Sequence, residues 1–167
     1  MESNSTYYKT PIGFAEIIGD KNGIQSIALL DNSTNEQSSG KFDLPQDIPE
    51  CLQECALQLK EYFKGERTKF DLLLNPQGTS FQKLVWKELC NIPFGKTRSY
   101  LAQSKLIGDP KAVRAVASAN GKNPIWIVVP CHRVIGSDGS LTGYAGGLWR
   151  KKWLLDHESP VKQQSLF

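Results

Sequence analysis

A thiol, an imidazole and a guanidinium stand side by side in the segment Pro130-Cys131-His132-Arg133-Val134. A cysteine thiol has an ordinary pKa near 8.5, so about 3% of it is the nucleophilic thiolate at pH 7. Use of Cys131 as a nucleophile therefore requires a base or a positive field. His132 is the nearest base, but consecutive side chains diverge, so a bridging water would have to carry the proton.

Two further charged residues are candidates to support this pair. Glu158, remote in sequence and expected on a helix, is the carboxylate that would orient the imidazole. Arg133 would hold the loop through backbone carbonyls or lower the local potential. The competing interpretation is that Cys131 is an inert core residue, as most unpaired cysteines are.

An apolar run, Ile125 to Val129, leads directly to this segment. Apart from Trp126 it is β-branched, which predicts a buried strand that places Cys131 at a rigid strand end. It is also the longest purely apolar stretch of the chain, and it is far too short to cross a bilayer. With 40% hydrophobic and 22% charged residues, the composition excludes disordered and collagen-like chains.

The first part of the chain predicts a small sheet with one helix. A turn-rich sequence at 19–23 indicates a β-hairpin, and Gly65 ends a segment with a helical apolar period. The expected elements are strands at Ile12–Ile18 and Ile24–Leu30, a helix from Pro49 to Lys64 and a short strand at Phe70–Leu74. The turn-forming segment Asn75–Gly78 predicts a boundary between two domains, residues 1–75 and residues 76–167.

The second domain is predicted to be mostly helical. Three helices are expected. The first has Ser80 as its N-cap, the second extends from Ser99 to Ile107, and the third runs from Pro110, with Asp109 as N-cap, to about Asn120. The last two have the form of a helix-turn-helix, although a purely structural helical hairpin would give the same pattern. Small residues on the last helix, with Lys111, Arg114 and Lys122, favour close approach to a nucleic-acid groove.

The charge of the chain is unevenly distributed between the two domains. The net charge of +3 combines seven basic and twelve acidic residues up to position 75 with thirteen basic and five acidic residues beyond it. The first domain thus carries −5 and the second +8. This asymmetry predicts a polyanionic partner for the second domain alone.

No secretory or transit signal is recognisable in the polar segment Met1–Thr10, so we expect a cytoplasmic protein. The four cysteines are too few for a disulfide scaffold. Cys51 and Cys55 have no nearby His or Cys that would complete a zinc site, so both are expected on the buried face of a helix. No metal, cofactor or membrane association is predicted.

The segment Pro130–Val134 resembles the active-site signature of the 6-O-alkylguanine-DNA alkyltransferases, the methylated-DNA–protein-cysteine methyltransferases that repair alkylated guanine. The resemblance covers nearly the whole chain and implies an α+β protein with a ribonuclease H-like first domain. The other similar segments are Thr10–Gly13, Gly78–Gln82, Val85–Trp86, Ile92–Thr97, Ser99–Tyr100, Arg114–Val116, Asn120–Pro124, Gly143–Tyr144 and Trp153–Leu155, with Glu158.

What the resemblance implies can be carried over position by position. Cys131 would accept the alkyl group irreversibly, His132 would be the water-mediated base, Glu158 would polarise it, and Asn123 would hold the strand and hinge. The substrate would be 6-O-methylguanine in double-stranded DNA, with 4-O-methylthymine as a second substrate, flipped out of the helix. A monomer that reacts once is implied.

Two further groups of residues follow from the family resemblance and from the basic residues on and beside the helix expected from Pro110 to about Asn120. The first group would contact DNA, with Arg114 entering the base stack and Tyr100 pressing on a phosphate, and its other members are Lys111, Ala115, Ser118, Lys122 and Arg133. The second group would form the pocket of the flipped base and comprises Tyr100, Val134, Ser137, Tyr144 and Ala145.

Three other functions fit parts of the sequence. A damage-recognition protein of the same fold would bind alkylguanine without transfer, but such relatives carry tryptophan where this chain has Cys131. A helix-turn-helix transcription factor would lack an evident dimerisation segment here. A thiol protease would need a base remote in sequence, and the only remote histidine is His157.

Overall fold

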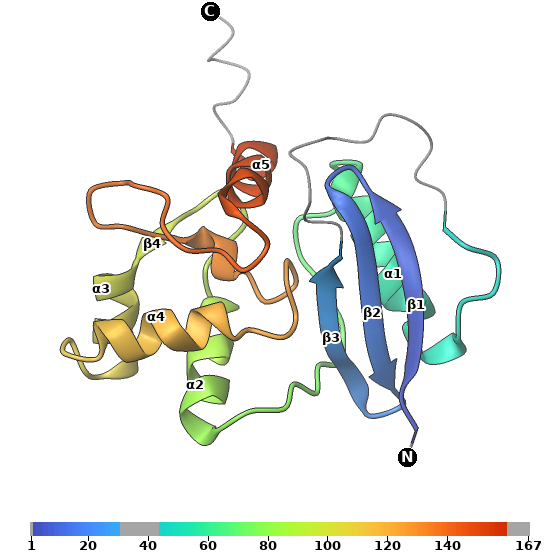
Figure 1. The fold of residues 1–167 in the computed structure, drawn as a ribbon, viewed down its shortest axis with the longest axis horizontal. Coiled ribbons are helices and arrows are strands. Elements are labelled where there is room, and N and C mark those ends of the chain that lie inside the picture. Colours follow the sequence, from blue (N-terminus) through green and yellow to red (C-terminus); the bar gives the residue numbers. More distant parts are fainter. Residues whose placement is uncertain (1, 31–43, 160–167) are drawn as a thin grey trace, which may run out of the picture. The chain divides into compact units, whose positions relative to one another are not determined.

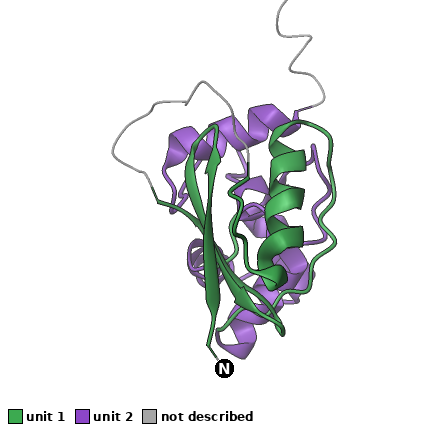
Figure 2. Cartoon of the chain, turned by 90° about the vertical axis from the view of Figure 1, so that its right-hand side faces the viewer, with its two compact units in different colours: residues 1–77, 124–126 green, residues 78–123, 127–167 purple. Residues whose placement is uncertain are grey.

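The computed structural model describes residues 2–30 and 44–159, which fall into two compact units (Figures 1 and 2). Unit 1 contains residues up to 77 together with 124–126, and unit 2 contains 78–123 and the residues from 127 onward. The sequence placed 124–126 in the second domain. These residues belong to unit 1 because Ile27 pairs with them, its N–H donating to Pro124 O at 2.9 Å and its carbonyl accepting from Trp126 N at 3.0 Å.

Unit 1 is a three-stranded antiparallel sheet with one helix across a face, as Figure 1 shows. The elements are β1 (Asn4–Thr10), β2 (Gly13–Asp20), β3 (Gly23–Leu29) and α1 (Glu50–Phe63). The predicted hairpin and helix are confirmed. Strand β1 was not predicted, because its buried positions are Thr6, Tyr8 and Thr10, which give no strong apolar alternation.

The core of unit 1 lies between α1 and the sheet. Leu52 and Leu59 on the helix and Ile17 and Ile27 on the strands are fully buried, as expected for an amphipathic helix on a half-buried sheet. The strand predicted at 70–74 is reduced to a single parallel bridge between Leu74 and Ile24.

Unit 2 consists of short helices joined by loops. Its elements are α2 (Ser80–Leu89), β4 (Arg98–Ser99), α3 (Tyr100–Ile107), α4 (Val113–Gly121), the 3-10 helix η1 (Cys131–Arg133), β5 (Val134–Ile135) and α5 (Leu148–Glu158). Strands β4 and β5 pair in parallel and bring the start of α3 beside the end of η1. Among the described helices, none is long and apolar enough to span a membrane.

Two helix starts differ from the prediction. Thr79 caps α2 in a capping box with Gln82, so the cap is one residue earlier than Ser80. Helix α4 begins at Val113 and not at Pro110. Asp109 accepts hydrogen bonds from Lys111 N at its side chain and from Ala112 N at its carbonyl, so the proline occupies the second position of a turn.

The strand predicted at 125–129 is the clearest error. Ile125 makes one bridge to Ile27, and the chain then turns at Ile127, which has a φ of 73° although it is β-branched and buried. The side-chain amide of Asn123 donates to Val129 O at 2.8 Å across this turn. An apolar, β-branched run is here a buried turn, and such strained backbone is typical of functional sites.

Candidate active site

Cys131 begins the short helix η1, directly after the buried turn. Its N–H donates to Val129 O at 2.8 Å, and its side chain is partly exposed. The residue after η1, Val134, is buried and pairs with Arg98 in the β4–β5 ladder. Cys131 is therefore held between the turn and a strand pair, and the residue as a whole is partly exposed.

The imidazole of His132 is fully buried against Glu158. Its Nε2 lies 2.7 Å from Glu158 Oε2, and the two side chains are 0% and 2% exposed. Burial lowers the pKa of His132, and the adjacent Glu158 only partly opposes this. The ring is therefore neutral at pH 7.

The carboxylate of Glu158 remains ionised in this buried position. Burial by itself would raise its pKa, but the charge that His132 carries when protonated at low pH, the charge of Arg133 and the hydrogen bonds of both residues outweigh burial and hold the pKa well below its usual range. An ionised carboxylate only accepts hydrogen bonds, so Nε2 of His132 must carry the ring proton. The other nitrogen, Nδ1, is then an acceptor, and it is buried without a hydrogen-bond partner among the described residues.

Arg133 faces the interior, contrary to the expectation that it contacts DNA. It is 6% exposed, and its Nε and Nη2 donate to the two oxygens of Glu158 at 2.7 and 3.0 Å. Its Nη1 donates to Ile92 O at 2.7 Å. All three guanidinium nitrogens are therefore engaged, which corrects the DNA-contact prediction and agrees with the alternative that Arg133 holds the loop through a carbonyl.

The Cys131 thiol is subject to opposing influences. Burial raises its pKa, whereas a hydrogen bond from Asn123 and the charge of Lys151 lower it. Asn123 thus contacts both the thiol and Val129 O, so it ties the nucleophile to the turn before it. The net pKa lies above the ordinary value, and the thiol needs a base in order to react near neutral pH.

Lys151 is a part of this site that the sequence reasoning missed. It is fully buried, and its Nζ donates to Val134 O and Thr142 O at 2.7 Å and to Gly143 O at 3.3 Å. Burial lowers its pKa to about 8. Its position seven residues before Glu158 places both on one face of α5, and this spacing is the signal that could have identified it.

The predicted base-pocket residues are only partly brought together. Tyr100 begins α3, its hydroxyl donates to Thr142 O at 3.1 Å, and its ring centroid lies 5.8 Å from Lys151 Nζ. Tyr144 is half-buried, and burial raises its pKa well above the ordinary value. Ser137 and Ala145 are exposed in the same long loop, and their place in a pocket stays a prediction.

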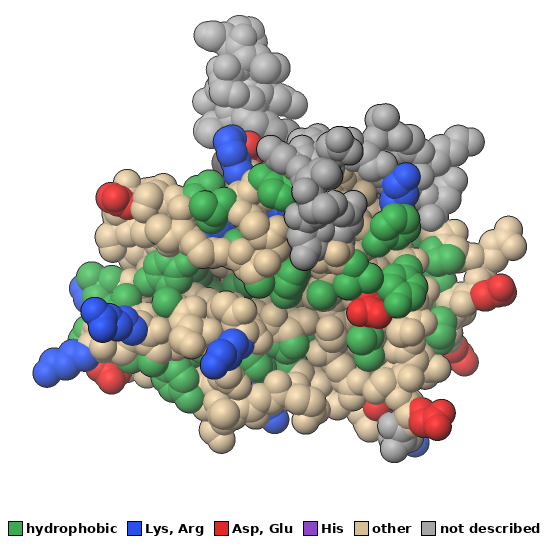
Figure 3. Space-filling view, viewed as in Figure 1, with side chains coloured by type: hydrophobic (Ala, Val, Ile, Leu, Met, Phe, Trp, Pro, Cys, Tyr) green, Lys and Arg blue, Asp and Glu red, His purple; other side chains and the backbone are tan. Residues whose placement is uncertain are grey.

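The remaining predicted DNA contacts share one exposed surface. Helix α4 buries Val116, Ala119 and Asn120 against its neighbours, with Trp86 Nε1 donating to Ala119 O at 2.8 Å. The residues expected to contact DNA on and beside this helix are all exposed, namely Lys111, Arg114, Ala115, Ser118 and Lys122. Figure 3 shows Lys and Arg side chains over the region that α3 and α4 occupy.

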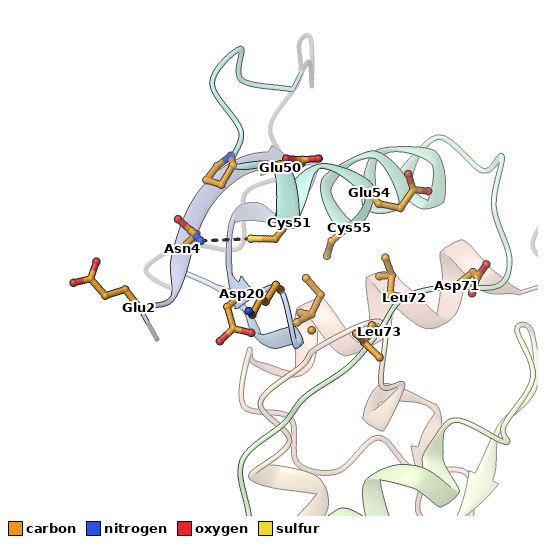
Figure 4. Close-up of a pocket in the computed structure, with 14 residues that line it drawn as sticks. Glu2, Asn4, Asp20, Glu50, Cys51, Glu54, Cys55, Asp71, Leu72 and Leu73 are labelled. Carbon is orange, nitrogen blue, oxygen red and sulfur yellow. Dashed lines mark hydrogen bonds between the residues drawn. The ribbon is translucent and has the colours of Figure 1, made fainter.

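Unit 1 contains a pocket whose lining includes none of the candidate active-site residues. This pocket, of about 730 Å³, is lined by the start of α1, the β2–β3 turn and residues 71–73 (Figure 4). Cys51 and Cys55 both line it. Cys55 is buried as predicted, but Cys51 is only half-buried. Among the described residues, no three His, Cys, Asp or Glu side chains are grouped as metal ligands would be.

Both parts of the chain match domains of the same protein family. Residues 5–76 match the ribonuclease-like domain of 6-O-methylguanine DNA methyltransferase, and residues 80–160 match its DNA binding domain. The methylated-DNA–protein-cysteine methyltransferase of Methanosarcina barkeri is 46% identical over 90% of this chain and 93% of its own. That of Mycobacterium tuberculosis strain H37Rv is also 46% identical, over 91% and 92%.

Solved structures agree with these sequence matches. The crystal structure of Mycobacterium tuberculosis OGT in complex with DNA has a TM-score of 0.79 and 42% identity, covering 95% of this chain and 93% of that chain. The crystal structure of the O6-methylguanine methyltransferase from the same organism has a TM-score of 0.78 at 38% identity, covering 99% of this chain and 100% of that chain. The predicted α+β fold is confirmed.

The Lys151→Met substitution tests the electrostatic link to the thiol. It removes a charge that lowers the pKa of Cys131, so below pH 8 alkylation of Cys131 by iodoacetamide should be slower than in wild type. The difference from wild type should narrow above pH 8, where Lys151 itself loses its charge. The rate is measured on the Cys131 peptide by mass spectrometry.

Lys152→Met is the matched control. It removes a neighbouring lysine of α5 that is 67% exposed and paired with Asp156, so its profile should coincide with that of wild type. A Lys151→Met rate equal to or above the wild-type rate below pH 8 would contradict the link.

Proposed function

Because the chain belongs to the 6-O-methylguanine-DNA methyltransferase family and repairs DNA by transferring an alkyl group to a protein cysteine, we propose that Cys131 is the acceptor. The observation that carries this proposal is the position of Cys131, a partly exposed residue, next to a buried His132–Glu158 pair. The pair supplies a neutral base at a place where burial keeps the thiol protonated.

The proposed reaction moves one alkyl group and two protons. A water passes the Cys131 proton to the free nitrogen of His132, and Glu158 stabilises the imidazolium that forms. The thiolate attacks the alkyl carbon, so that a C–S bond forms while the C–O bond to the guanine breaks. The departing base takes a proton at N3, for which the Tyr100 hydroxyl is our candidate donor, and the proton held by His132 then returns through solvent to restore that hydroxyl.

The product explains why we propose a single turnover. A thioether is stable, and side chains of this site offer no means of cleaving it. Each chain therefore accepts one alkyl group and is consumed, as a monomer acting in the cytoplasm.

The substrate atom must be brought out of the duplex before it can meet Cys131. We propose that 6-O-methylguanine, and also 4-O-methylthymine, is flipped out at a cost of a few kcal/mol, which a damaged pair lowers. The exposed surface of α4 would lie in the minor groove, with Arg114 filling the vacated stack and Tyr100 pressing on a phosphate. Affinity should fall with salt as phosphate contacts are screened.

Incubation with DNA that contains 6-O-methylguanine should add one methyl group per chain, on Cys131, as measured by mass spectrometry of the intact protein and its peptides. Cys131→Ala should take up none and should still bind the DNA, because the thiol is not part of the exposed α4 surface. Release of many product molecules per chain would refute the single turnover. Loss of DNA binding in the variant would indicate a structural cysteine.

Arg114→Ala should slow repair of duplex DNA much more than reaction with free 6-O-benzylguanine, because only the duplex leaves a gap in the base stack. Single-turnover rates on the two substrates give the comparison. Lys122→Ala is the control, since loss of a phosphate contact should weaken binding to damaged and undamaged duplex alike and reduce the salt slope by about one. If Arg114→Ala lowered the rates on duplex DNA and on free 6-O-benzylguanine equally, the stacking role of Arg114 would be refuted.

A further inference from the structure

We propose that Arg133 is a positioning residue for the reaction: its guanidinium fixes the plane of the Glu158 carboxylate, and through it the orientation of the His132 ring. The inference rests on the proposed role of His132 as the base for Cys131. It replaces the DNA contact that the sequence suggested for Arg133.

The geometry of the carboxylate carries the argument. Glu158 Oε1 accepts from Arg133 Nε at 2.7 Å, while Oε2 is shared between Arg133 Nη2 at 3.0 Å and His132 Nε2 at 2.7 Å. A glutamate carboxylate turns easily about its terminal torsion, so one contact to a histidine would not fix its plane. The two parallel donors of the guanidinium do so, because their spacing matches the two oxygens.

The guanidinium is itself anchored on a third segment. Arg133 Nη1 donates to Ile92 O at 2.7 Å, just beyond the end of α2, and its Cζ lies 5.9 Å from the centre of the Phe94 ring. One side chain thus connects the segment after α2, the helix η1 and the end of α5. A lysine would present a single ammonium and could not make these contacts in one plane.

Charge gives Arg133 a second effect on the base. The charged groups that shift the pKa of the imidazole are Glu158 and Lys151 from α5 and Arg133 from η1. Three further titratable groups interact electrostatically with these residues. Cys131 interacts with Lys151, Tyr144 with Glu158, and Cys90 at the end of α2 with Arg133. Arg133 and Lys151 both lower the pKa of His132. Loss of the arginine would raise that pKa, so that more of the ring would be protonated and unable to accept a proton.

The test compares Arg133→Gln and Arg133→Lys with wild type in single-turnover methyl transfer from duplex DNA, measured across pH. We expect Arg133→Gln to lose about tenfold or more at neutral pH, the scale seen when a partner that orients a histidine is removed. The acid limb of its profile should move to higher pH, and its DNA affinity should be unchanged. Arg133→Lys should also react more slowly, but with a smaller displacement of the acid limb. Lysine keeps the positive charge and lacks the two parallel donors of the guanidinium.

Arg98→Gln is the matched control. It breaks another Arg–Glu bridge of unit 2, the half-buried contact of Arg98 with Glu88 at 2.9 Å. Neither residue is among the groups that shift the pKa of His132. Its pH profile should be that of wild type. A purely structural Arg133 would lower the amount of folded protein but leave the rate and pH profile of the folded fraction unmoved, and that result would overturn the proposal.

A double variant keeps the test decisive if Arg133→Gln fails to fold because the buried charge of Glu158 is no longer matched by a positive charge. Arg133→Gln combined with Glu158→Gln removes both charges. If the arginine acts through the carboxylate, the double variant should react as Glu158→Gln alone does. A further loss in the double variant would overturn the proposal. Absence of methyl uptake by wild type would instead overturn the proposed function.

Discussion

The carboxylate of Glu158 lies at the end of α5, removed from water, and an ionised group in that position must be matched by opposite charge and by hydrogen-bond donors. Arg133 supplies the charge and His132 supplies the remaining donor. Because the partners come from η1 and the arginine is also bound to Ile92 O, the last helix can pack in only one register. The position of the nucleophile follows from that register.

The same requirement accounts for the chemistry of the neighbouring thiol. Within unit 2, burial suppresses charge on Cys131 and His132 and leaves a neutral thiol beside a neutral base. Lys151 and Asn123 act in the opposite direction and favour the thiolate. A nucleophile that is neutral at rest and loses its proton only when a substrate is aligned is protected from unproductive reaction with other electrophiles.

Sequence reasoning identified the chemical groups of the site better than their geometry. Cys131, His132 and Glu158 could be named because their residue types define a nucleophile, a base and a carboxylate. Arg133 was expected to contact DNA, and only the fold shows that it turns inward. Lys151 was missed because a lysine is rarely buried, although its spacing from Glu158 places it on the same helix face.

The fold was predictable where the signal is local. The hairpin, α1 and the two helices of the helix-turn-helix follow from period, caps and glycines, whereas β1 depends on pairing with β2 and has little apolar contrast of its own. The turn at Ile127 contradicts the residue's β preference because burial and the Asn123 contact outweigh it.

We infer that His132 is a neutral base, protonated at Nε2 and held by the Glu158 carboxylate. Nuclear magnetic resonance of the ring nitrogens, with His157→Gln used for assignment, measures this protonation state directly. We expect an Nε2–H tautomer at neutral pH and a titration midpoint below the ordinary value of 6.5. A doubly protonated ring at neutral pH, or a proton on Nδ1, would contradict it.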